Sequence, residues 1–383
     1  MPTSEKPLSL LTATRASLRD TGPVGLVLTP AGDEAWLVTR HAEVKALLHD
    51  ERLGRSHPDP AAAPKYVKND LLAMLITPDA EAARQMHARA RTLLTPHFSA
   101  RRVRDLKPRI EALTDAMLDR FTTDEPPADL HAGFSLPLSL QILCELLGVP
   151  ADERHRCAEL LARAGQVGTD GSGGPAALFA MLTELADRKR DDPGDDVVSR
   201  LATSGIPDEQ TGSLAATLLF AGLDAVATHI DLGVVLLTEH GGQRDEVLAD
   251  PDRLGGMVDE VLRTAKQSGA ILPRYATGDI EIAGVRISAG DLVLLDFALA
   301  NFDERVFGEP DRFDVTRSPN PHLTFGHGIW HCIGAPLARV ELATAFTRLY
   351  ERMPRLRPAV PVEQLTARDG QLVHGLAELP VTW

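Results

Sequence analysis

The sequence predicts a mostly α-helical fold with small peripheral β-sheets. Aromatic residues make up 4% of the 383-residue chain, while 44% of it is hydrophobic. A composition rich in alanine, leucine and arginine favours helix over sheet. From His41 onward the pattern is helical and is punctuated by proline and glycine. The sequence carries neither a strand–helix alternation nor a glycine-rich phosphate loop, which argues against a nucleotide-binding fold.

Three segments break the helical pattern with strand signals. Leu26–Leu28 and Ala35–Thr39 flank the turn Thr-Pro-Ala-Gly-Asp and predict a hairpin. The segment from Gln371 to Thr382 predicts a closing strand pair. Three short apolar runs separated by glycine turns predict a second β region, namely Ile280–Ile282, Val285–Ile287 and Leu292–Leu295.

Two strong breaks predict helix ends, one at Gly148-Val-Pro150 and one over the run from Asp191 to Asp196, which contains Pro-Gly. Between them, two helical stretches are joined by the Gly/Ser-rich connection Val167–Pro175, which we expect to be mobile. The longest apolar stretch runs from Leu214 to Leu237. Charged residues interrupt it, so it predicts a buried central helix rather than a membrane span.

Charge and cysteine content narrow the class of protein and its compartment. The formal net charge is −14, which argues against a nucleic-acid partner. Three scattered cysteines are too few for a disulfide framework and indicate a reducing compartment. The N-terminal residues show neither an apolar core nor a cleavage pattern for export. We therefore expect a cytoplasmic protein without a membrane anchor.

The most informative segment runs from Phe325 to Arg339. Gly326, Gly328 and Gly334 surround Cys332 immediately before an apolar helical run. Glycines allow a backbone to approach a ligand closely, and a helix N-terminus stabilises a thiolate. These are the requirements of a thiolate-ligated iron. On its own, the pattern also fits a small buried cysteine in a turn. A zinc site with the neighbouring histidines is disfavoured, because no second cysteine or histidine pair stands at zinc spacing.

This segment, Phe-Gly-x-Gly-x-x-x-Cys-x-Gly followed by Ala338-Arg339, resembles the haem-binding signature of the cytochrome P450 superfamily. Three further motifs of that family follow its order, at Glu260–Arg263, Pro273–Thr277 and Ala300–Asp314. The resemblance is close over residues 212–345 and patchy over the first two hundred. It implies a single haem-thiolate oxygenase domain over residues 1–383, with a helix-rich body and a smaller β-containing lobe. It also implies a haem b whose iron is ligated by Cys332.

The resemblance implies which residues hold the haem. His87 and Arg91 would share one helix face and bind the propionates. Arg274 would be a third contact, while Phe325, Gly326 and Gly334 would shape the loop against the ring. Trp330 is a departure, because the family usually has histidine or arginine there. An indole N–H can donate a hydrogen bond but carries no charge. The ion pair of Glu260 and Arg263 is implied to be structural.

The segment Ala221-Gly222-Leu223-Asp224-Ala225 resembles the oxygen-activating Ala-Gly-x-(Asp/Glu)-Thr motif of the family. The acid and the threonine help to deliver protons during oxygen activation, and Ala225 stands where the threonine belongs. Gly222, Asp224 and Ala225 are thus implied to be catalytic. A hydroxyl of the substrate, or a water it orders, could complete the relay. Alternatively, the reaction needs less protonation, as in ring coupling, dehydrogenation or peroxide-driven chemistry. We favour the first interpretation. Leu223, Ala270 and Ile271 are candidate substrate contacts.

The resemblance implies a monooxygenase that hydroxylates a small organic molecule, with a secondary metabolite favoured. Electrons would come from a ferredoxin or flavodoxin-type donor that docks on a local basic patch, for which Arg91, Arg101, Arg102 and Arg339 are candidates. We expect a monomer. The alternatives are a peroxide-using or coupling enzyme, and a non-catalytic haem-binding partner protein. The presence of the acid, the cysteine and the ion pair argues against the last.

Overall fold

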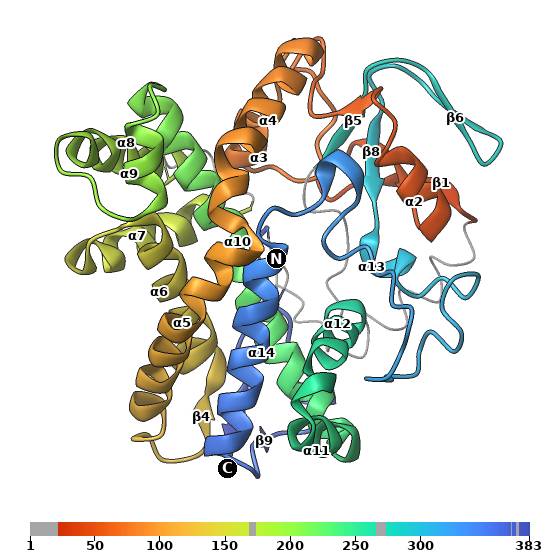
Figure 1. Cartoon of the computed structure of the whole chain (residues 1–383). Coiled ribbons are helices and arrows are strands. Elements are labelled where there is room, and N and C mark those ends of the chain that lie inside the picture. Colours follow the sequence, from red (N-terminus) through yellow and green to blue (C-terminus); the bar gives the residue numbers. More distant parts are fainter. Residues whose placement is uncertain (1–21, 168–173, 266–272, 369, 373–374) are drawn as a thin grey trace. The chain divides into compact units, whose positions relative to one another are not determined.

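The computed structural model describes residues 22–167, 174–265, 273–368, 370–372 and 375–383. Helix accounts for 56% of the structure and the sheets are small, so the predicted fold class is confirmed (Figure 1). The chain divides into two compact units, each built from three segments. The first unit takes Met1–Ala88, Glu239–Cys332 and Val362–His374, and the second takes Arg89–Thr238, Ile333–Pro361 and Gly375–Trp383.

The first unit is organised around a five-stranded sheet with the strand order β1-β2-β8-β5-β3. The predicted N-terminal hairpin is confirmed, since β1 and β2 pair antiparallel. The second β region is confirmed as strands, but they divide between two sheets. The β6 and β7 strands form a separate hairpin, while β8 pairs parallel with β2 and antiparallel with β5. The strands are β1 (Val24–Leu28), β2 (Glu34–Val38), β3 (Leu53–Gly54), β5 (Arg274–Ala276), β6 (Ile280–Ile282), β7 (Val285–Ile287) and β8 (Leu292–Leu295).

Apolar side chains of this sheet pack against helix α2 (His41–Leu47). Val38, Val293 and Leu295 form one buried cluster with Val44 and Leu47 of that helix. The helices that lie in or begin in this unit are α2 (His41–Leu47), α3 (Asp70–Met74), α4 (Ala80–Leu94), α11 (Gly241–Ala249), α12 (Leu254–Thr264) and α13 (Phe297–Ala300).

The second unit is almost entirely helical, and α5 packs against α14 (Figure 1). Both predicted helix breaks are confirmed. Helix α6 ends at Gly148, and Asp196 caps α9 by accepting a hydrogen bond from the Ser199 N–H at 2.8 Å. Most of the predicted connection Val167–Pro175 lies outside the described residues. The helices are α5 (Ala100–Phe121), α6 (Leu136–Leu147), α7 (Arg154–Ala164), α8 (Gly174–Asp191), α9 (Val197–Ala202), α10 (Asp208–Glu239) and α14 (Ala335–Arg352).

Helix α10 is the predicted central helix. It is long and apolar enough to cross a membrane, but 67% of its most apolar stretch is buried inside the structure. One of its charged residues has a partner there. The carboxylate of Asp231 is fully buried and lies 2.6 Å from Nδ1 of His131. A buried carboxylate with such a partner is typical of a protein core, so α10 is a core helix.

Part of the segment that predicts a closing strand pair lies outside the described residues. Among the described residues of that segment, one strand forms, β10 (Pro380–Thr382), and its partners are β4 (Ala128–Asp129) and β9 (Arg357–Pro358). Asp129 anchors this small sheet, because its Oδ1 accepts hydrogen bonds from the N–H groups of His131 and Leu379 at 3.0 and 2.9 Å. A local hydrophobic pattern does not reveal a strand partner so far away in the sequence.

Helix α14 carries a carboxylic acid into the core of the second unit. Glu341 is 2% exposed, although its helix neighbours on the buried face are apolar, among them Leu337 and Leu342. Burial raises the pKa of Glu341 to about 8 from its ordinary value of 4.5. This side chain is therefore mostly protonated at neutral pH.

Candidate active site

The loop that carries Cys332 is shaped by two close backbone contacts. The Cys332 N–H donates to the Phe325 carbonyl at 2.7 Å and closes the loop around a short 3-10 helix (Gly328–Trp330). Gly326 has a φ of 69°, and a Cβ at this position would lie 2.8 Å from the carbonyl oxygen of Trp330, so only glycine fits. The Cys332 thiol is exposed, whereas the other two cysteines of the chain are buried. Cys332 is therefore the cysteine that can reach a ligand.

The start of this loop is attached to the end of α12 by Thr324 and is also held by Asn301. Thr324 Oγ1 donates to the Leu262 carbonyl at 2.8 Å and accepts from Nδ2 of Asn301 at 2.9 Å. Asn301 Oδ1 accepts from the Leu323 N–H at 2.7 Å. The placement of the cysteine loop in this unit thus depends on Asn301.

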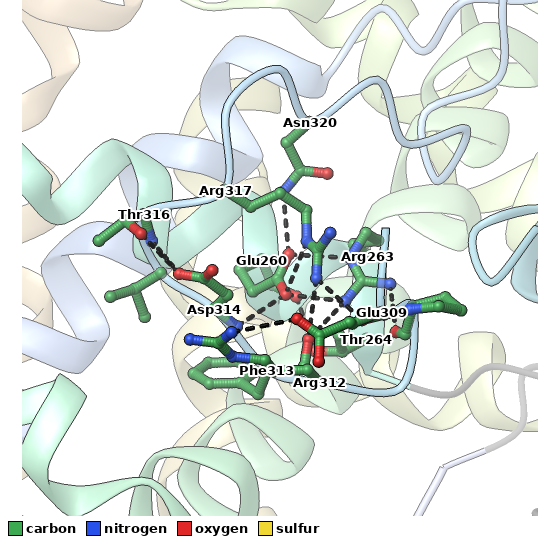
Figure 2. A network of polar contacts seen from close by, with 12 residues as sticks. Glu260, Arg263, Thr264, Glu309, Arg312, Phe313, Asp314, Thr316, Arg317 and Asn320 are labelled. Carbon is green, nitrogen blue, oxygen red and sulfur yellow. Dashed lines mark hydrogen bonds and ion pairs between the residues drawn. The ribbon is translucent and has the colours of Figure 1, made fainter. Parts of the chain in front are cut away.

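Asn301 is itself held by the ion pair of Glu260 and Arg263, whose side chains are fully buried (Figure 2). Arg263 Nε and Nη2 donate to the two Glu260 carboxylate oxygens at 2.8 and 2.7 Å. Arg263 also donates to the carbonyls of Asn301, Pro310 and Arg312 at 3.0, 2.8 and 3.2 Å. One arginine therefore connects α12 to two separate points of the following segment.

Glu260 makes a second set of contacts with the same segment. Its carboxylate accepts from the Asp314 N–H at 2.9 Å, from Nδ2 of Asn320 at 3.1 Å and from Nε of Arg317 at 3.3 Å. Figure 2 shows the side chains of Arg317 and Asn320 close to the carboxylate. Both buried charges are thus surrounded by hydrogen-bond partners, the condition under which a buried ion pair is tolerated. The contacts support the structural role expected for the pair.

The predicted haem-carboxylate residues His87, Arg274 and Trp330 lie together. The imidazole of His87, on α4, is 4.5 Å from the Trp330 ring, centroid to centroid. The guanidinium carbon of Arg274, on β5, lies 4.6 Å from the same ring centroid, and Arg274 is 8% exposed. Arg55, which the sequence analysis did not single out, also lies over Trp330, at 5.3 Å. The indole thus stands at the centre of a cationic cluster.

Two further predicted haem contacts lie in the second unit. Arg91 lies one turn after His87 in α4 and is partly exposed. Gly334 is the N-cap residue of α14.

The candidate oxygen-activating segment lies in the middle of α10. Asp224 and Ala225 are partly exposed, and the Ala225 carbonyl is 2.7 Å from Nδ1 of His229. A Cβ at Gly222 would lie 3.1 Å from the methyl groups of Leu143 in α6. Gly222 therefore allows two helices to pack closely. Leu223 is 7% exposed, and its expected role as a substrate contact stays a prediction.

Comparison with known proteins identifies the family. The sequence model of cytochrome P450 matches residues 253–353. Pentalenolactone synthase of Streptomyces exfoliatus is 39% identical to this chain, over 96% of this chain and 94% of that protein. The chain belongs to the cytochrome P450 family.

Further P450 relatives are similar over nearly the whole chain. Mycinamicin IV hydroxylase/epoxidase of Micromonospora griseorubida is 37% identical, over 96% of this chain and 94% of that protein. The substrate-free structure of P450 PimD, a polyene macrolide antibiotic pimaricin epoxidase, is 52% identical, with a TM-score of 0.88, over 99% of this chain and 96% of that one. The predicted class is confirmed, and the protein is a P450 monooxygenase, an oxidoreductase.

The residues described above fit a haem, the cofactor that the P450 family implies. The first unit presents one exposed thiol on a glycine-shaped loop, and beside it in sequence the cationic cluster around Trp330. Within that cluster, Nε of Arg55 is buried and has no hydrogen-bond partner among the described residues. A thiolate is a suitable ligand for a haem iron, and the guanidinium groups are suitable partners for the two haem propionates.

Some expectations for this P450 change with the structure or fall outside it. Ala270 and Ile271, the other candidate substrate contacts, lie outside the described residues. In the expected basic patch, Arg102 is paired with Asp195 at 3.2 Å, so its charge is partly neutralised. Arg55 was missed because it belongs to no recognisable motif.

Proposed function

We propose that this P450 oxidises a macrocyclic polyketide by inserting one oxygen atom into a C–H bond or across an olefin. The observation that carries the proposal is the 52% identity to a polyene macrolide epoxidase over 99% of the chain. The likeness to a mycinamicin hydroxylase/epoxidase supports the same substrate class. The reaction would consume O₂, two electrons and two protons and release water. The chain would act as a single catalytic domain over residues 1–383.

Haem b with a thiolate ligand would, when bound, supply the reductive activation of O₂ and the transfer of one oxygen atom. Cys332 would ligate its iron, and His87, Arg91, Arg274 and Trp330 would bind its carboxylates. Phe325, Gly326 and Gly334 would let the loop backbone approach the ring. Asp224 would pass protons inward from its partly exposed position in α10. At Ala225, a substrate hydroxyl or an ordered water would take the place of the missing threonine side chain.

A small ferredoxin or flavodoxin-type protein would supply the electrons to a monomeric, cytoplasmic enzyme. Its docking patch would rely on Arg101 and Arg339 more than on Arg102, whose charge Asp195 offsets. Docking of this kind depends on the local field rather than on the net charge of the whole chain.

The substrate class is tested by spectral titration followed by turnover. A polyene macrolactone is expected to shift the Soret band of the ferric protein as it displaces water from the iron. With reduced ferredoxin and O₂, it should then gain the mass of one oxygen atom. A small terpenoid serves as the control and should do neither. Oxidation of the terpenoid alone, or turnover with peroxide but not with ferredoxin, would contradict the proposal.

The proton pathway is tested at the position where this chain departs from its family. Asp224→Asn is expected to slow ferredoxin-driven turnover about 10²-fold, in the range typical of a lost proton-transfer group. Turnover driven by peroxide, which arrives already reduced, should change far less.

Ala225→Thr is expected not to raise the product formed per electron consumed, since the added atoms crowd the place of the substrate hydroxyl.

Val226→Thr is the matched control for Ala225→Thr, because it adds a hydroxyl at a partly exposed neighbour without adding volume. It should leave the product formed per electron unchanged. A clear rise in coupling with Ala225→Thr alone would refute the substrate-assisted relay. It would point to a natural reaction in which protonation is not the demanding step.

A further inference from the structure

Arg55 stands beside Arg274 because of the register of two strands. It directly follows β3, and β3 pairs antiparallel with β5 so that Gly54 is opposite Tyr275. Continuing that register by one residue on each strand brings position 55 alongside position 274. The two arginines, far apart in the sequence, therefore approach the same indole from adjacent strands, at 5.3 and 4.6 Å from the Trp330 ring centroid.

This arrangement concentrates positive charge in a poorly solvated place. Burial lowers the pKa of Arg55. Burial, followed by the positive charge of Arg55, holds the pKa of Arg274 well below its ordinary value. The face of an indole attracts a guanidinium, but by about 0.5–2 kcal/mol, which is small against the cost of burying an unpaired charge.

Arg55 has no anion to offset that cost within the described chain. None of the described carboxylates forms an ion pair with it, and its Nε is buried without a hydrogen-bond partner. By contrast Arg52, three residues earlier, is 53% exposed and pairs with Asp50 at 2.6 Å. A partly buried guanidinium whose buried Nε–H has no partner among the described residues is suited to a carboxylate from outside the chain.

We propose that Arg55 is an additional haem-anchoring residue, which binds a propionate together with Arg274 and supplies the charge that Trp330 lacks. The inference rests on the proposed haem site. Trp330 would then not bind the propionate by charge, as the histidine or arginine usual at its position does. Instead, its ring face would position the guanidinium groups of Arg55 and Arg274. In this chain the cation beside the propionate would therefore come from Arg55, after β3, and not from the cysteine loop.

The test measures how fast the holoenzyme loses haem to an excess of apomyoglobin, which is followed by absorbance and needs no turnover. Arg55→Gln should lose haem about tenfold faster than wild type, the effect of about 1.4 kcal/mol of lost binding. Arg55→Lys, which keeps the charge, should lie between the two. Arg52→Gln is the matched control and should match wild type. Circular dichroism of each variant checks that it is folded.

Haem loss that is equal in wild type, Arg55→Gln and Arg55→Lys would overturn the inference. The inference would also be overturned if Arg55→Gln left the rate of haem loss unchanged but weakened the binding of a macrolactone carboxylic acid. In that case binding of the methyl ester of the same macrolactone should not change. Arg55 would then serve a substrate carboxylate. These outcomes differ from failure of the proposed function, in which the wild-type protein itself would show no thiolate-ligated haem.

Discussion

Alanine at Glu260 or at Arg263 is expected to leave little or no folded, haem-loaded protein. Glu260→Ala would leave the charge of Arg263 buried without a carboxylate, and Arg263→Ala would leave Glu260 with Arg317, at 3.3 Å, in place of its bidentate partner. Breaking a buried pair of this kind costs about 3–5 kcal/mol. The whole free energy of unfolding of a typical domain is about 5–15 kcal/mol. The lost contacts also hold Asn301, which positions the cysteine loop. Yield of soluble protein, haem content per chain and the denaturation midpoint measure the effect.

The chain offers a control with the same spacing and different burial. Glu309 and Arg312 also form an i,i+3 ion pair, at 3.2 Å, but their side chains are 75% and 62% exposed. Alanine at Arg312 removes this contact and should change the free energy of unfolding by no more than about 1 kcal/mol. If the variants of both pairs were equally stable and fully loaded with haem, the predicted contribution of the buried Glu260–Arg263 pair to stability would be wrong.

Cys332→His is expected to abolish the strongly red-shifted Soret band that a thiolate-ligated haem gives in its reduced, CO-bound form. An imidazole is a neutral ligand, so the electron donation of the thiolate disappears even where the haem is retained. Turnover with ferredoxin should be lost with it. The measurement is the difference spectrum of the reduced protein with and without CO.

Cys157→Ala is the control, because Cys157 is a buried residue of α7 in the other unit. Its CO spectrum should keep the wild-type position. A red-shifted band that survives Cys332→His would mean that the iron ligand is another group, and the proposed site would then be wrong.

The parts of the site that are local in sequence could be predicted from it. The cysteine loop is read from glycines within a few residues of Cys332. Glu260 and Arg263 are one helical turn apart, so their pairing needs no tertiary information. The hairpin of β1 and β2 was predictable for the same reason, since its turn lies between its strands.

The features that could not be predicted depend on partners that are distant in the sequence. The close packing of Gly222 against Leu143 of another helix cannot be read from the local sequence. Arg55 meets Trp330 because β3 pairs with β5, and a two-residue strand leaves no periodic signal. The partners of β10 in the closing segment, β4 and β9, lie elsewhere in the chain, so its own residues do not reveal them.

The buried acid of α14 makes folding of the second unit a proton-binding reaction. Glu341 is ionised above pH 4.5 in the unfolded chain but keeps its proton up to a pH of about 8 when folded. Its contribution to stability is therefore complete below pH 4.5 and is lost as the pH rises through about 8. Between these values, each pH unit removes about 1.4 kcal/mol from the free energy of unfolding. At neutral pH the unfolding protein releases this proton to the buffer.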